Sequence, residues 1–220
     1  QVSFPFMDED YQFECREAAT GEEALLMLEA APPEILLLDN KLPGIDGMEV
    51  LEIIKQKNMD IMVAMITSYA SLEIAAKATD DGARDFIPKP FTIDEIMGGI
   101  YRGIEYYKIQ QELNKQKTNG DNSTIIYVPC PIKYYRFGLN SWVNKDNEGS
   151  IFIGVTDLYV KTVKGIKQIN LKSVNENLIQ GRSCAELITT DGLANFLLSP
   201  ISGKIINVNE ELLNDLTLIE

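Results

Sequence analysis

The sequence predicts an α/β domain built on a doubly wound parallel sheet, followed by a small all-β barrel or sandwich. Two continuous apolar runs, Glu34–Asp39 and Asp60–Ile66, alternate with amphipathic helical segments, which is typical of parallel strands buried on both faces. A polar stretch over residues 116–123 separates this pattern from short β-rich runs punctuated by Gly, Pro, Asn and Asp. We therefore expect an α/β domain over residues 1–104, a helical extension and linker over 105–123, and a β domain over 124–220.

Helix starts in the first part carry capping signals. Thr20 and Glu23 have the spacing of a capping box, and Thr92 and Glu95 repeat it before a long helix that runs on past the domain. Ser71 is expected to cap the helix between them.

The second part is predicted to be rich in short strands. A short helix is expected after Thr156 and another near Glu210. The predicted strands are Thr124–Val128, Ser150–Val155, Ile166–Asn170, Ser183–Thr189, Ala194–Leu198 and Lys204–Val208.

Composition excludes several classes of function. The net charge of −13 argues against nucleic acid as a direct partner, because phosphate backbones need clustered Lys and Arg. The chain has no histidine, which removes imidazole bases and histidine metal ligands. The cysteines Cys15, Cys130 and Cys184 are far apart and are expected to be reduced, as in a cytoplasmic protein. No apolar run has the length of a membrane span, so no membrane partner is expected.

Three polar side chains stand at the ends of successive predicted strands. Asp39 and Thr67 each end an apolar run, and Lys89 follows the third strand. Because the carboxyl ends of parallel strands share one edge, the three groups are expected to meet there. A carboxylate can attack phosphorus, and an ammonium with a divalent cation can neutralise the phosphoryl oxygens, so this set favours phosphoryl transfer.

The motifs LLLDNKLPGIDG, MITSYAS and DFIPKPF resemble those of two-component receiver domains, in the same order and spacing. The resemblance implies a flavodoxin-like fold in which Asp39 is the phosphoacceptor and Lys41 offers a backbone carbonyl to Mg²⁺. It implies that Thr67 bonds the phosphoryl group and that Lys89 pairs with it. Phe86 is then the aromatic switch residue that turns inward, and a cis bond follows Lys89.

The same resemblance implies a strand before the first one found here. Receiver domains begin with a strand that ends in two acidic Mg²⁺ ligands, whereas Phe6–Tyr11 resembles the loop ahead of their second strand. A sheet cannot omit a central strand without losing its hydrogen-bond ladders, so we expect the sequence to be incomplete at its start. Asp8, Glu9 and Asp10 are expected to form a solvated loop instead.

Residues 136–215 resemble the H-protein of the glycine cleavage system. The supporting segments are LNSWV, IGVTD and SPISGKIINVNEELL. Asn140 stands where that family usually has histidine, and Trp142 is expected in the core or in a cleft wall.

The H-protein family carries lipoate on a lysine at a hairpin tip, and this chain lacks that lysine. Counting from Ser199 places the position at Gly192, whereas counting from Gly181 places it at Asp191. No lysine occurs from Ser173 to Gly203. The tip, Thr190–Leu193, is predicted to form a type I′ turn. We therefore expect no lipoate.

These observations favour a non-enzymatic response regulator, phosphorylated by a sensor histidine kinase, that acts through a protein partner of its H-protein-like domain. A homodimer through the receiver face at 68–78 and 86–95 is also considered. The alternative is a structural or regulatory subunit of a metabolic enzyme complex, in which the receiver only docks. A third hypothesis is a lipoyl carrier that uses another lysine, such as Lys204.

Overall fold

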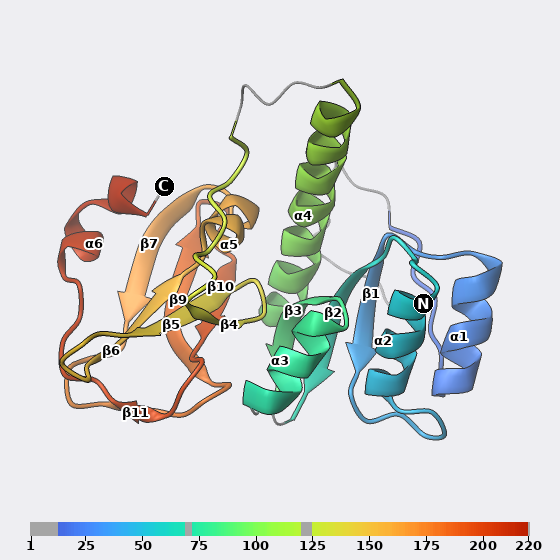
Figure 1. Ribbon diagram of the computed structural model, residues 1–220, viewed down its shortest axis with the longest axis horizontal. Coiled ribbons are helices and arrows are strands. Elements are labelled where there is room, and N and C mark those ends of the chain that lie inside the picture. The colour runs from blue at the N-terminus through green and yellow to red at the C-terminus, as the bar shows by residue number, and fades with distance from the viewer. Residues whose placement is uncertain (1–12, 69–71, 120–124, 220) are drawn as a thin grey trace.

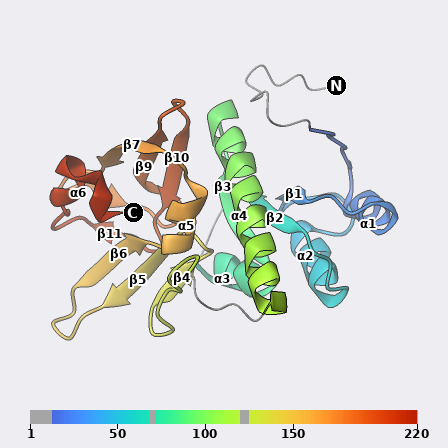
Figure 2. The same cartoon turned by 90° about the horizontal axis from the view of Figure 1, so that it is seen from above.

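The computed structural model describes residues 13–68, 72–119 and 125–219. They form two parts, which we call the α/β domain (13–68 and 72–119) and the β domain (125–219). Figure 1 shows the long helix α4 standing between the strands of the two domains, and Figure 2 shows the same arrangement from above. The expected boundaries at 104 and 124 stay predictions.

The α/β domain contains a parallel sheet with strand order β1-β2-β3. The expectation of an earlier strand concerns residues outside those that the structure describes. The elements of this domain, in chain order, are α1 Gly21–Ala30, β1 Ile35–Asp39, α2 Gly47–Gln56, β2 Met62–Thr67, α3 Leu72–Asp80, β3 Ala83–Pro88 and α4 Ile93–Asn119.

The strands are apolar throughout because both faces of the sheet are covered. Along β2, Val63 and Met65 face the core shared with α1, α2 and α3. The alternate residues Met62 and Ala64 pack on the opposite face, beside Ile96 and other side chains of α4. This two-residue periodicity makes the predicted apolar runs strands of a doubly wound sheet.

Helix caps follow the sequence signals closely. Thr92 and Glu95 form the predicted capping box, with Glu95 N–H donating to Thr92 Oγ1 at 3.2 Å. Thr20 caps α1 as predicted, but the Glu23 carboxylate accepts from Ala19 N–H instead of from the cap residue itself. The predicted Ser71 cap lies outside the described residues.

The β domain is mostly antiparallel, which agrees with the predicted barrel or sandwich. Its strands form the groups β4-β5-β6, β10-β9-β7 and β11-β8. Its elements are β4 Tyr135–Phe137, β5 Ser141–Lys145, β6 Ile151–Val155, α5 Asp157–Thr162, β7 Ile166–Leu171, β8 Asn177–Leu178, β9 Ser183–Thr189, β10 Ala194–Leu198, β11 Gly203–Lys204, α6 Glu211–Asn214 and a 3-10 helix, Leu216–Leu218.

Several predictions for the β domain were right, and two strands were wrong. The predicted strands β6, β7, β9 and β10 and the helix after Thr156 are present. Residues 125–128 form no strand, and the run predicted over 204–208 pairs only at Gly203–Lys204. Ile205 still exchanges backbone hydrogen bonds with Asn175 and Glu176, but the residues after it form no strand, because β propensity alone does not make one. The strands β4, β5 and β8 were not predicted.

The hairpin between β9 and β10 does not form the predicted type I′ turn. Such a turn needs positive φ at both central residues, but Gly192 (φ 93°) has it and Asp191 does not. Gly192 N–H donates to the Thr189 carbonyl at 2.9 Å, so Thr190 and Asp191 form the turn and glycine follows it in the left-handed region.

Candidate functional site

The ends of the three parallel strands bring the predicted polar residues to one edge of the sheet. Asp39 is the last residue of β1, and its backbone pairs with Ile66, one residue before Thr67 at the end of β2. Thr67 pairs in turn with Pro88, and Lys89 N–H donates to the Thr67 carbonyl at 2.8 Å. Parallel register therefore fixes the three backbones side by side.

Asp39 and Lys89 form an ion pair at this edge. Lys89 Nζ bonds Asp39 Oδ2, and Lys41 N–H donates to Asp39 Oδ1 at 3.0 Å. The two charged side chains are 29% and 34% exposed, so a small reactant in solution can reach the carboxylate. The Lys89–Pro90 peptide bond is cis, as predicted.

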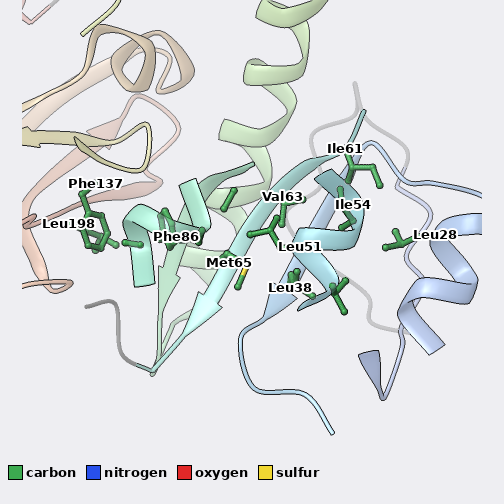
Figure 3. Close-up of a cluster of buried hydrophobic side chains, with 14 residues drawn as sticks. Leu28, Leu38, Leu51, Ile54, Ile61, Val63, Met65, Phe86, Phe137 and Leu198 are labelled. Carbon is green, nitrogen blue, oxygen red and sulfur yellow. The ribbon is translucent and has the colours of Figure 1, made fainter. Parts of the chain in front are cut away.

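Thr67 and Phe86 lie deeper than the ion pair. Thr67 is buried at the end of β2. Phe86, on β3, is also buried and contacts the β domain: its ring lies 5.4 Å from that of Phe137, tilted by 58°. Figure 3 shows Phe86 beside Phe137 and Leu198.

Asp39 is the carboxylate that the described residues offer to a magnesium ion at this edge. No cluster of three or more Asp, Glu, Cys or His side chains suited to a metal occurs in the ranges that the structure covers. Mg²⁺ often binds through one or two carboxylates and keeps several waters alongside substrate phosphate oxygens. The partly exposed Asp39 carboxylate, which already accepts an N–H and an ammonium, fits that role.

The hairpin tip that corresponds to the lipoyl position offers no amine. Gly192 is open, since a Cβ built there would meet nothing within 4 Å. Asp191 Oδ1 is held locally by the Thr189 hydroxyl. Lys204 lies on β11 instead, paired with Asn177 of β8 and therefore away from the hairpin.

A buried polar network joins the two domains, and sequence reasoning missed it. Arg102 of α4 donates through Nη2 to Asp85 Oδ2 at 2.7 Å and through Nη1 to Asn195 Oδ1 at 2.6 Å. Asn140 Nδ2 donates to the other oxygen, Asp85 Oδ1, at 2.8 Å. All four residues are buried. We call these contacts, together with Phe86 and Phe137, the seam.

Charge complementarity stabilises the seam. Burial by itself lowers the pKa of Arg102, but the adjacent Asp85 carboxylate outweighs burial and raises the pKa, which keeps the guanidinium charged. The guanidinium also lies 5.4 Å from the centre of the Tyr159 ring. Burial raises the pKa of Tyr159 to about 12, so the phenol stays neutral and donates to the Phe196 carbonyl at 3.1 Å.

One unusual residue noted in the sequence lies in the seam. Asn140 departs from the residue usual in the family that the β domain resembles, and it proves to be a seam residue. Asp85 directly follows the charged Arg84, and Arg102 is three residues from Glu105, so the local sequence around neither residue indicates a buried pair. Trp142, predicted for the core or a cleft wall, is half-buried, and its Nε1–H donates to the Val155 carbonyl at 2.8 Å.

A cavity lies away from Asp39. It measures about 330 Å³ and is lined by the start of β2, near Asp60, by Arg84 of β3 and by Tyr106 of α4. These residues mark the opposite end of the sheet from Asp39, so the cavity is separate from the ion pair.

Among the residues that the structure describes, no helix is both long and apolar enough to cross a bilayer.

Comparisons with known proteins match both domains. Residues 5–101 match the Response regulator receiver domain family, and residues 133–220 match the Glycine cleavage H-protein family. The DNA-binding transcriptional regulator NtrC of Escherichia coli (strain K12) is 37% identical over 112 residues, which are 51% of this chain and 24% of NtrC. The chain therefore spans about a quarter of the NtrC regulators that it matches.

A shorter relative is covered more fully. Sporulation initiation phosphotransferase F of Bacillus subtilis (strain 168) is 37% identical over 95 residues, which are 43% of this chain and 75% of that protein. The crystal structure of the receiver domain of NtrX from Brucella abortus is 34% identical, with 42% of this chain and 79% of that chain covered and a TM-score of 0.40.

Proposed function

Because the chain belongs to the response regulator receiver family and carries a glycine cleavage H-protein domain behind its receiver, we propose that it is a response regulator phosphorylated on Asp39. The phosphoryl donor is a sensor histidine kinase, and the output is a protein contact made by the H-protein domain. The observation that carries this proposal is the Asp39–Lys89 ion pair at the ends of three parallel strands.

The proposed reaction is a phosphoryl transfer between side chains. A carboxylate oxygen of Asp39 forms a bond to phosphorus while the P–N bond to the kinase histidine breaks and its electron pair returns to the imidazole. Lys89 passes from the carboxylate to a phosphoryl oxygen, and the Thr67 hydroxyl donates to another. A Mg²⁺ ion held by Asp39 and the Lys41 carbonyl would neutralise the phosphoryl charge.

Labelling with a small donor tests the proposal. The purified chain is incubated with phosphoramidate and Mg²⁺, and its intact mass is measured. We expect one phosphoryl mass on the wild type and none on Asp39→Asn, which keeps the shape of the side chain but lacks the nucleophilic oxygen. Labelling of both proteins alike would contradict the assignment of Asp39.

A second candidate function has one observation in its favour. Residues 133–220 match the Glycine cleavage H-protein family, which favours a structural or regulatory subunit of a metabolic enzyme complex. In that function the receiver serves for docking only. An absence of phosphoryl mass on the wild type would favour it, whereas labelling that Asp39→Asn abolishes would favour signalling.

The acidic chain is expected to bind protein partners. With a net charge of −13, we propose neither nucleic acid nor a membrane as a partner. A homodimer through the receiver face would have to displace the β domain from Phe86, which Phe137 covers. We propose that the chain catalyses no reaction of its own. We also propose that it carries no lipoate, since Gly192 offers no amine.

A further inference from the structure

The cavity at the end of the sheet opposite Asp39 has the size of a small-ligand site. Its volume of about 330 Å³ falls within the range common for such sites, roughly 300–1,000 Å³. It lies between the C-terminal end of α2, the starts of β2 and β3, and the middle of α4 (Figure 1). Because the length of the sheet separates it from Asp39, the chemistry of its occupant has to be argued from its own lining.

One carboxylate in the lining has a buried oxygen without a partner. Asp81, the residue after α3, accepts from Lys55 Nζ through Oδ1 at 3.0 Å. Its other oxygen, Oδ2, is shielded from solvent and accepts no hydrogen bond from the residues that the structure describes. A buried acceptor is costly until a donor meets it. Lys55 also lies in the last turn of α2, where the helix end carries partial negative charge. This part of the cavity therefore favours a cationic donor such as a primary ammonium.

A guanidinium also lines the cavity. Arg84, on β3, has its guanidinium carbon 6.0 Å from the centre of the Tyr106 ring. A guanidinium matches the geometry of a carboxylate with two parallel hydrogen bonds. The charged side chains of the lining are two of each sign, Lys55 and Arg84 against Asp60 and Asp81. Since their formal charges cancel, the cavity favours a ligand that carries both charges over one that carries either alone.

The rest of the lining offers space for an apolar group. Leu51, Ile54 and Ile61 line the cavity and are buried (Figure 3). Met62, at the start of β2, is buried beside them. Apolar walls around a few polar groups are the usual composition of a small-molecule site. A ligand with an ammonium, a carboxylate and a short apolar branch matches all three features of the lining.

We propose that this cavity binds a free α-amino acid with an apolar side chain. The ligand's ammonium donates to Asp81 Oδ2, its carboxylate accepts from Arg84, and its side chain packs against Leu51 and Ile54. This inference goes beyond the proposed function and does not require phosphorylation of Asp39, so either can fail alone.

Calorimetric titration with L-leucine and two analogues tests the need for both charges. 3-Methylbutylamine has the leucine skeleton without the carboxylate, and 4-methylpentanoate has it without the amine. We expect the wild type to bind one L-leucine saturably and each analogue at least about tenfold more weakly, the loss expected for one hydrogen bond to a charged group. No saturable binding of L-leucine, or equal affinity for either analogue, would overturn the inference.

A matched pair of variants places the ammonium. Asp81→Asn keeps the shape of the side chain and removes its charge, whereas Asp80→Asn makes the same change at the exposed neighbour. We expect Asp81→Asn to bind L-leucine about tenfold more weakly and to lose the discrimination against 4-methylpentanoate. Asp80→Asn should match the wild type. A change in discrimination, unlike a plain loss of binding, does not follow from a destabilised fold.

Arg84→Gln gives the complementary result for the carboxylate. We expect this variant to lose the discrimination against 3-methylbutylamine and to keep that against 4-methylpentanoate. L-leucine binding that neither Asp81→Asn nor Arg84→Gln alters would overturn the placement in this cavity. Asp39→Asn should bind L-leucine as the wild type does, so a failure of phosphoryl labelling would overturn the proposed function and leave this inference standing.

Discussion

Arg102 shows how much one residue contributes to cohesion between the domains. Its guanidinium is buried and donates to both Asp85 and Asn195, which come from different domains. Removal of one member of a buried ion pair leaves the other charge uncompensated, which is far more costly than loss of a surface pair.

We expect Arg102→Met to lower the free energy of unfolding by about 3–5 kcal/mol, because the Asp85 carboxylate stays buried without its cation. Lys172→Met is the matched control, since its pair with Glu176 spans 3.5 Å and is exposed. That control should change stability far less, because an exposed pair contributes little. Urea denaturation followed by circular dichroism measures both, and equal effects would contradict the role of the network.

Burial of the Tyr159 phenol should make stability depend on pH. Its pKa is raised to about 12 by burial, above the ordinary value of 10. Between these values the unfolded chain ionises and the folded chain does not, so stability falls as pH rises through this window, by about 1.4 kcal/mol per unit.

Tyr159→Phe removes that ionisation together with the hydrogen bond to the Phe196 carbonyl. We expect the variant to be about 1 kcal/mol less stable than the wild type at pH 8, with the difference closing and then reversing above pH 10. Urea midpoints at pH 8, 10 and 11 check this. Parallel curves for the two proteins would show that the phenol is not buried as described.

At the level of elements, the sequence predicted the strands and helix caps that depend on nearby residues. The strands β1 and β2 were predictable because apolar runs of that length suit a sheet covered on both faces. The ends of the strands then placed Asp39 and Lys89 together, since parallel strands share one edge. The caps at Thr92 and Thr156 followed from side-chain hydrogen bonding to nearby backbone.

Elements that depend on distant partners were harder to predict. The strand β4 is three residues long and owes its pairing to β5, and β8 is two residues long and pairs with β11 across the domain. The turn type at the hairpin tip was also predicted wrongly. Asp191-Gly192 is typical of a two-residue turn, but the register of β9 and β10 adds a residue to the loop.

We predict that the hairpin between β9 and β10 is not lipoylated. Incubation with lipoate and a lipoate ligase should leave the intact mass of the wild type unchanged, because residues 173–203 contain no lysine. Gly192→Lys is the matched variant that restores an amine at the open tip. A lipoyl mass on the wild type that Lys204→Met removes would instead support the carrier hypothesis.

At the scale of the whole molecule, the seam was beyond reach of the sequence. Asp85 and Asn140 are 55 residues apart, and Arg102 and Asn195 are 93 apart, in domains with separate patterns. No local periodicity reports such pairs, because each residue is consistent with its own element. The seam nevertheless places the β domain against β3, the strand that Lys89 follows.

The most direct test of the central claim maps the phosphorylated atom. After reaction with phosphoramidate and Mg²⁺, borohydride reduces an acyl phosphate to the corresponding alcohol, and peptide mass spectrometry then locates the reduced residue. We predict reduction at Asp39 alone, with none in a sample treated without donor. A phosphoryl group that resists hydroxylamine, or reduction at any other carboxylate, would contradict the claim that these strand ends form a phosphoacceptor site.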